Sequence, residues 1–268
     1  MKSVCNIFLI AFVWIRVAAG LLAFAVANAF VAAAIAAAYL LFFWSKPLRQ
    51  KAIAAALGAA LKFMFLGVVR WLGGYDLNVE KPKRLPEAAI YTANHISLFD
   101  ALILLAIIPN AGVMIKRKYS GILSIWLLVK TFDFIVVDSD APNATEDVIV
   151  RARRALAQKR SILIFPEGRR SNVGRVLEFK KSAFKLAFET GAKIVPVAIY
   201  SPRPFLPKGE LSIREKTYYK IKFSAPLDPE KSASPSALRD AAYDTVARQV
   251  HAFRDREEER PPRYQLLK

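Results

Sequence analysis

The sequence predicts an α/β fold: a mixed, mostly parallel sheet flanked by helices and preceded by an apolar, membrane-anchoring helical segment. Two observations lead to it. From Asp76 onward, short runs rich in β-branched residues alternate with helical patterns, as in layered α/β domains. Before that residue the chain carries no Asp or Glu at all. We therefore expect a membrane anchor with interfacial helices (residues 1–74), an α/β domain (75–225) and a C-terminal amphipathic helix with a tail (226–268).

The anchor is predicted from residues 17–44, which contain no charged side chain. As a helix they would extend about 42 Å, more than the roughly 30 Å of a bilayer's hydrocarbon core. Lys46, Arg49 and Lys51 follow closely, and basic residues beside a span favour the cytoplasmic side. We expect an inner or cell membrane location, with the α/β domain on the cytoplasmic side.

Other readings of this region stay open. Residues 7–15, ahead of Arg16, are apolar, too short to cross a membrane alone, and suited to one limb of a re-entrant hairpin. Ala-x-Ala sites near residues 25–29 suit a cleaved signal peptide, although Arg16 and the long apolar run argue against cleavage. Residues 52–71 predict a further helix, either in the membrane interface or in the core of the domain.

The elements of the α/β region follow from the periodicity of its apolar residues. Six strands are predicted, at residues 88–93, 112–115, 134–137, 161–165, 193–200 and 218–223. Helices are predicted at residues 100–108, 121–130, 145–159 and 177–190. A last amphipathic helix is predicted at 234–256, with Ser234 as its N-cap and Pro235 at its first position.

Net charge limits the class of partner. A charge of +18 and a pI of about 10.1 favour polyanions. Nucleic acid is disfavoured, because the sequence has no zinc-ligand spacing, no aromatic RNA-binding signature and no separate basic tail. Cys5 is the only cysteine, which excludes an intramolecular disulfide. An anionic membrane surface and phosphorylated substrates are the partners that remain.

His95 and Asp100 stand where a predicted strand gives way to a predicted helix. Imidazole is the side chain best suited to acid–base chemistry near neutral pH. Residues five apart are about 140° apart around a helix, so this pair can meet only across a turn. An aspartate there would orient the imidazole and stabilise its protonated form. From these residues alone, a polar loop residue followed by a helix cap is the alternative.

A second charged loop, residues 165–171 (Phe-Pro-Glu-Gly-Arg-Arg-Ser), follows another predicted strand. Gly168 permits a positive φ angle, so the loop can turn tightly. Arg169 and Arg170 present N–H donors suited to phosphate oxygens. Loops at strand ends of open α/β sheets are where ligands usually bind. A surface turn whose charges are merely solvated is the alternative.

Together the two motifs resemble the glycerophospholipid acyltransferase family, which includes the lysophosphatidate (1-acylglycerol-3-phosphate) acyltransferases. The family's first block, Asn-His-x4-Asp, is matched by Asn94, His95 and Asp100. Its third block, Phe-Pro-Glu-Gly-Thr-Arg-Ser, is matched at residues 165–171, with Arg169 replacing threonine. Residues 179–184 and 194–199 resemble the family's downstream Phe-Lys-x-Gly-Ala-Phe and its fourth block.

The resemblance implies acyl transfer from acyl-CoA or acyl carrier protein to the free hydroxyl of a lysophospholipid, without a cofactor or a metal. His95 would be the general base, and Asp100 would orient it. The residues implied in substrate binding are Asn94, Glu167, Gly168, Arg169, Arg170, Ser171 and Lys180. Glu167 has the wrong charge to contact phosphate, so we expect it to hold the loop or orient an arginine. Lys116 and Lys118 would add to the basic field.

The second block departs from the family. The family commonly has Gly-x-x-Phe-Ile-x-Arg, whose arginine is thought to help hold the acceptor's phosphate. Here residues 132–138 end in Asp138, and no glycine opens them. Lysophosphatidate is the first choice of acceptor, and a lyso-ornithine-type lipid is the second because of this reversed charge.

Two other classes of function compete. Asp138 and Asp140 form an Asp-x-Asp motif after a hydrophobic run, which suits a divalent cation in a glycosyltransferase or an aspartate-dependent phosphatase. A non-catalytic membrane protein that binds anionic lipid through its basic surface is the other rival. A metal requirement would favour the first, and lipid binding without turnover the second.

Overall fold

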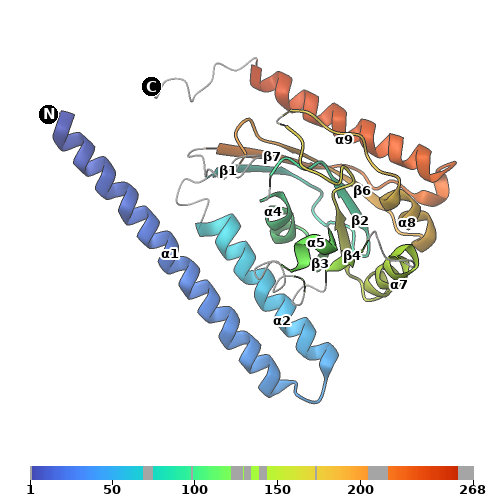
Figure 1. The fold of residues 1–268 in the computed structure, drawn as a ribbon, viewed down its shortest axis with the longest axis horizontal. Coiled ribbons are helices and arrows are strands. Elements are labelled where there is room, and N and C mark those ends of the chain that lie inside the picture. Colours follow the sequence, from blue (N-terminus) through green and yellow to red (C-terminus); the bar gives the residue numbers. More distant parts are fainter. Residues whose placement is uncertain are drawn as a thin grey trace.

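The computed structural model describes residues 2–68, 75–97, 99–121, 129, 134–138, 144–172, 174–204 and 217–258. An N-terminal pair of long helices lies beside an α/β domain (Figure 1). The helices are α1 (Lys2–Leu41), α2 (Lys46–Leu61), α4 (Asp100–Ile107), α5 (Arg117–Ser120), α7 (Ala144–Ala157), α8 (Ser182–Thr190) and α9 (Pro235–Glu258). Two short helical turns, η1 (Lys62–Val68) and η2 (Pro229–Lys231), complete the described helical part.

The N-terminal pair turns at residues 42–45. Helix α1 runs without a break past Arg16, so residues 7–15 continue the helix and do not form a separate limb of a hairpin. The chain has no proline before Pro47, at the start of α2, and the alanine-rich stretch after Arg16 favours helix. Within the described residues, no helix has both the length and the apolar character needed to cross a membrane. The predicted spanning segment is therefore unconfirmed.

The sheet has seven strands in the order β1-β7-β6-β2-β5-β3-β4. Their bounds are β1 (Tyr75–Glu80), β2 (Ile90–Ala93), β3 (Ala111–Lys116), β4 (Ile135–Val137), β5 (Ser161–Ile164), β6 (Ile194–Tyr200) and β7 (Thr217–Phe223). All neighbouring pairs are parallel except β6 and β7. The carboxyl ends of β2, β5, β3 and β6 therefore meet at one edge, which is the edge where ligands bind in such sheets. The mixed, mostly parallel sheet is as predicted.

The central strands are buried on both faces. Every residue of β2, β5 and β6 is buried, as expected for parallel strands between helical layers. Alternate residues enter different cores: Tyr91 and Leu163 pack on the side of α4, while Ile90 and Ile162 pack with α7, α8 and α9. The result is a three-layer domain, with the N-terminal helices beyond α4 (Figure 1).

All six predicted strands are present, with ends shifted by up to two residues. The sequence did not predict β1, whose residues Asp76, Asn78 and Glu80 are exposed, because a half-solvated edge strand lacks an apolar run. The predicted N-cap at Ser234 is confirmed, since its Oγ accepts the N–H of Ala237 at 3.1 Å. The helix predicted at 121–130 lies almost wholly outside the described residues.

Candidate active site

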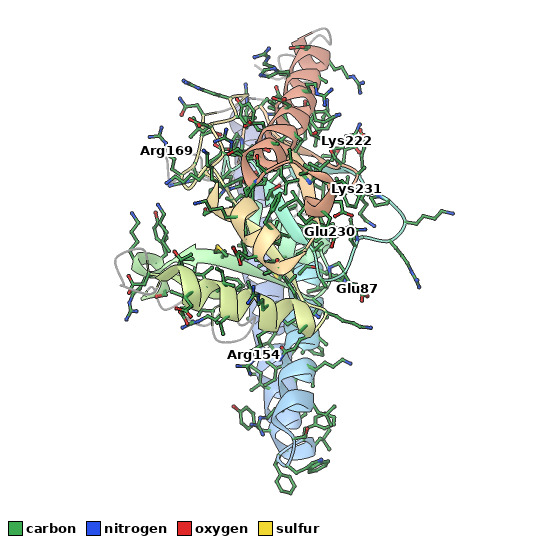
Figure 2. The ribbon with its side chains drawn as sticks, turned by 90° about the vertical axis from the view of Figure 1, so that its right-hand side faces the viewer. Glu87, Arg154, Arg169, Lys222, Glu230 and Lys231 are labelled. Carbon is green, nitrogen blue, oxygen red and sulfur yellow. The ribbon has the colours of Figure 1, made fainter. Side chains whose placement is uncertain are left out.

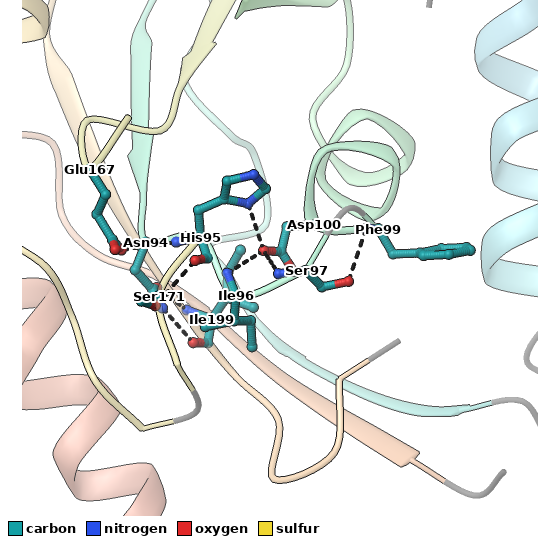
Figure 3. Close-up of polar contacts among 9 residues, drawn as sticks. All are labelled: Asn94, His95, Ile96, Ser97, Phe99, Asp100, Glu167, Ser171 and Ile199. Atoms are coloured by element: carbon teal, nitrogen blue, oxygen red, sulfur yellow. Dashed lines mark hydrogen bonds and ion pairs between the residues drawn. The ribbon is translucent and has the colours of Figure 1, made fainter. Parts of the chain in front are cut away.

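The predicted contact between His95 and Asp100 is present. Strand β2 ends at Ala93 and helix α4 begins at Asp100, so the histidine lies in the turn between them. Its Nδ1 is 2.9 Å from Asp100 Oδ2 (Figure 3). The same oxygen accepts the backbone N–H groups of Ile96 at 2.7 Å and Ser97 at 2.8 Å. One carboxylate oxygen thereby fixes the whole turn as well as the imidazole.

This arrangement determines which imidazole nitrogen is available. A carboxylate that already accepts two backbone N–H groups acts as an acceptor, so Nδ1 carries the proton and Nε2 presents its lone pair. The ring of Phe165 stacks on the imidazole, with centroids 4.2 Å apart and planes inclined by 26°. The histidine side chain is 18% exposed and the aspartate side chain is fully buried. The ring is therefore held rigidly, with one edge accessible to a ligand.

Glu167 ties the second loop to the first. Its Oε1 accepts the N–H of His95 at 3.0 Å, and its Oε2 accepts the N–H of Leu177 at 3.2 Å. Burial raises the pKa of Glu167 to about 8, although hydrogen bonds from His95, Leu177 and Ser171 oppose the shift. Glu167 thus holds the loop, which is one of the two roles expected for it.

Two further buried side chains fix the backbone around His95. The amide of Asn94 donates to the carbonyl of Ile199 at 2.8 Å and accepts its N–H at 2.7 Å, so β2 is joined to β6. Ser171 donates its N–H at 2.7 Å and its hydroxyl at 3.1 Å to the carbonyl of His95. Both residues were predicted to bind substrate, and that role stays a prediction. In the structure their side chains bond to the backbone of Ile199 and His95, and Ser171 also hydrogen-bonds Glu167.

A cavity of about 890 Å³ lies beside the loop that carries Glu167. Its basic lining residues are Lys116, Lys118, Arg169, Arg175, Lys180, Lys181 and Arg239, against two carboxylates, Glu167 and Glu178. Arg169 projects outward from the loop (Figure 2). Such an excess of cations favours an anionic ligand.

Of the residues predicted to bind substrate, the cavity gathers Glu167, Gly168, Arg169 and Lys180. Gly168 has the predicted positive φ, +68°. Lys180 lies over it, since its N–H donates to the carbonyl of Pro166 at 3.0 Å and its side chain would contact a Cβ at position 168. Arg170 is half-buried and does not line the cavity.

Sequence reasoning missed Arg175, Lys181 and Arg239 as lining residues. Lys181 follows Lys180 within the motif at residues 179–184, and that position was the only indication in the sequence that it lies near the site. Arg239 belongs to α9, far along the chain, and nothing in its local sequence connects it with the two motifs. Only the packing of α9 against the sheet brings it there.

The aspartate in the second block is paired. Asp138 Oδ2 is 3.0 Å from Arg117 Nη1, with both side chains partly or largely exposed. Its negative charge is thus balanced locally. Asp140, the other member of the Asp-x-Asp motif, lies outside the described residues, and among those described no three His, Cys, Asp or Glu side chains are grouped to hold a metal.

The fold and the site define an α/β enzyme domain whose His–Asp pair lies at the carboxyl edge of a mostly parallel sheet. The pair does not itself line the basic cavity, and Glu167 connects the cavity to the backbone of His95. Residues 76–200 match the family model described as Acyltransferase. Over most of its α/β domain, the chain is therefore similar to that family.

The relatives of this chain among curated proteins share one description. A 1-acyl-sn-glycerol-3-phosphate acyltransferase of Cocos nucifera is 30% identical over 166 residues, which are 60% of this chain and 52% of that protein. The Borreliella burgdorferi protein of the same name is 30% identical over 52% of this chain and 56% of its own length. The chain thus spans about half the length of the curated relatives it matches.

A solved structure, described as the 1-acyl-sn-glycerophosphate (LPA) acyltransferase PlsC from Thermotoga maritima, has the same fold. It superposes with a TM-score of 0.69 at 22% identity, over 95% of this chain and 98% of that one. The similarity therefore extends beyond the matched domain to the N-terminal helices and α9.

Proposed function

We propose that this chain transfers an acyl chain from acyl-CoA or acyl carrier protein to the free hydroxyl of lysophosphatidate, giving phosphatidate. The observation that carries the proposal is the 2.9 Å contact between His95 Nδ1 and Asp100 Oδ2 beside a basic cavity. The names of the relatives support the acceptor, and the Asp138–Arg117 pair removes the main reason to prefer a cationic headgroup.

In the proposed mechanism, Nε2 of His95 takes the proton of the acceptor hydroxyl as its oxygen attacks the thioester carbonyl. Asp100 holds the tautomer and stabilises the imidazolium that forms. The carbon–sulfur bond then breaks, and the leaving thiolate takes the proton from the imidazolium. A thioester is already activated, so the chemistry needs no covalent intermediate on the protein.

The headgroup's phosphate would be held by three cations of the cavity: Arg169 on the loop of Glu167, together with Lys180 and Lys116. Arginine at position 169 supplies a cation where the family has threonine. Arg169 would in this way replace the arginine that the second block lacks at position 138.

We place the reaction at a membrane surface, with the α/β domain on the cytoplasmic side. The support is the large apolar surface of the N-terminal helices, where Leu40, Phe43 and Trp44 are 77%, 72% and 67% exposed. The net charge of +18 favours an anionic lipid surface.

The test is acyl transfer by membranes that contain the protein, with labelled acyl-CoA or acyl carrier protein and a panel of lysolipid acceptors. We expect His95→Ala to lower transfer by about 10²–10⁴-fold, the contribution of a positioned general base. His251→Ala, which changes the exposed second histidine on α9, is the matched control and should be fully active. Wild-type rates in His95→Ala would eliminate the proposed base, and the best acceptor would name the headgroup.

A further inference from the structure

The cavity has two walls that come from different parts of the chain. The near wall is the loop of Glu167, Gly168 and Arg169, joined directly to His95 through the Glu167 carboxylate. The far wall carries Arg175 and Lys181, from the segment between the loop and α8, together with Arg239 from α9. Glu167 joins the near wall to the far segment, because its Oε2 accepts the N–H of Leu177.

The far wall is available for an anion. Arg175 and Lys181 are exposed, and within the described part of the chain neither side chain pairs with a carboxylate. Arg239 is only 19% exposed and is oriented by Asp240, whose Oδ1 is 2.7 Å from its Nη2. Its contact with Glu178, at 3.8 Å, is long, and that carboxylate is 88% exposed, so it competes weakly with a ligand.

The proposed reaction brings two phosphorylated substrates to one histidine, and their phosphates lie at different distances from the reacting atoms. In lysophosphatidate only a glycerol unit separates the hydroxyl from the phosphate, so that phosphate must lie by the near wall. In the acyl donor the long pantetheine arm separates the thioester from the first phosphate, so that phosphate must lie farther from His95. The cavity has cations both on the loop joined to His95 and on a second segment, so it offers separate places for two phosphates.

We infer that Arg175, Lys181 and Arg239 form a binding site for the phosphate at the end of the acyl donor's pantetheine arm. The inference rests on the proposed function and adds the part of the site that receives the donor. The ligand chemistry is shared by coenzyme A and by the phosphopantetheine group of acyl carrier protein. Arginine and lysine donors suit phosphate oxygens in both.

The test compares the wild type with the double variant Arg175→Ala/Lys181→Ala and with Arg239→Gln. We expect the KM for the acyl donor to rise about tenfold or more in each, with kcat and the KM for lysophosphatidate little changed. Lys185→Ala is the matched control, because Lys185 is an exposed cation on α8 outside the cavity. An acyl-pantetheine donor, which lacks phosphate, should be used equally well by all these proteins.

The donors separate the sources of the phosphate. If the KM rises only for acyl carrier protein, the site binds the phosphate of its phosphopantetheine arm. If the KM rises for acyl-CoA, the site binds the phosphate of coenzyme A. An unchanged donor KM in active variants, or a rise in the acceptor KM instead, would overturn the inference while leaving the proposed function intact. Calorimetric titration with coenzyme A itself needs no turnover: binding weakened tenfold in the double variant supports the site even if no transfer is found, and equal binding rejects it.

Discussion

At the residue scale, the site is organised by carboxylates that accept backbone N–H groups. Asp100 takes two from the turn after β2, and Glu167 takes one from that turn and one from the segment before α8. Each of the two side chains therefore fixes the backbone near His95. Asp100 in addition bonds to the imidazole, whereas Glu167 acts on His95 only through its backbone. This difference separates a residue that touches the reacting group from one that positions it.

The carboxyl group of Glu167 should give the protein a pH-dependent stability. Its pKa is about 8 in the folded protein, against an ordinary value of 4.5. Between these values the folded state binds the proton more tightly than the unfolded state, so its contribution is fully present below pH 4.5 and is lost as pH rises through about 8. The loss is on the order of a few kcal/mol.

Urea unfolding of the wild type and Glu167→Gln at pH 5 and pH 8.5 measures this effect. The fall in stability should be much smaller in Glu167→Gln, because glutamine does not titrate. Glu87→Gln, which changes an exposed carboxylate, should keep the wild-type fall. Parallel profiles for all three proteins would show that Glu167 does not titrate in this range.

Sequence reasoning reached the residues whose partners are close in the chain. His95 and Asp100 are five residues apart, and strand-to-helix patterning predicted the turn that lets them meet. It could not assign the amide of Asn94 to Ile199, 105 residues away, or Glu167 to the N–H of His95, 72 residues away. Such pairings depend on the order of the strands in the sheet, and the periodicity of apolar residues locates strands without revealing their order.

At the element scale, the same limit explains a shifted helix. Periodicity predicted a helix from residue 177, but α8 begins at Ser182. The N–H of Leu177 bonds to Glu167 and that of Lys180 to the carbonyl of Pro166, so tertiary contacts replace the first helical turn. The extended segment thereby lies along the active-site loop and presents Lys180 and Lys181 to the cavity.

The turn at Gly168 offers a test of how the loop supports the site. Gly168 and Gly191 have nearly equal φ angles, +68° and +69°, so alanine at either should cost about 1–2 kcal/mol in unfolding free energy. A Cβ at Gly168 would also lie 3.2 Å from Lys180 Cε and Nζ, whereas one at Gly191 meets nothing within 4 Å.

The tail of Lys180 can move aside, but the backbone strain at Gly168 falls in the loop that holds His95. We therefore expect Gly168→Ala to lose about tenfold or more in acyl-transfer rate. Gly191→Ala should lose stability alone. The free energy of unfolding, measured with denaturant, and the initial rate of acyl transfer should be compared for both variants. Equal rates in the two would mean that the loop absorbs the methyl group without moving the site.

At the scale of the whole molecule, most of the large exposed apolar side chains lie on the N-terminal helices. Small residues bring the N-terminal helices together: Ala27 and Ala38 of α1 and Ala60 of α2 are buried, while large side chains face outward. Basic side chains such as Arg154, Lys222 and Lys231 project from the α/β domain (Figure 2). Composition predicted the apolar N-terminal region, because residues 17–44 contain no charged side chain. It could not predict that a 40-residue helix and its neighbour fold back on each other.

Phe43 and Trp44, at the turn between α1 and α2, should control the partition of the protein into lipid. They are 72% and 67% exposed, and their edge-to-face contact, with centroids 5.1 Å apart, holds both rings at the end of the helical pair. Full transfer of a large apolar side chain out of water contributes about 1.5–3 kcal/mol, so Phe43→Ser/Trp44→Ser should weaken binding to anionic vesicles tenfold or more. Cosedimentation with vesicles measures the partition coefficient. Val150→Ser removes a 58% exposed apolar side chain from α7 in the α/β domain and should bind as the wild type does. Equal weakening in both variants would mean that apolar surface in general, rather than the turn of the N-terminal helices, determines the contact with lipid.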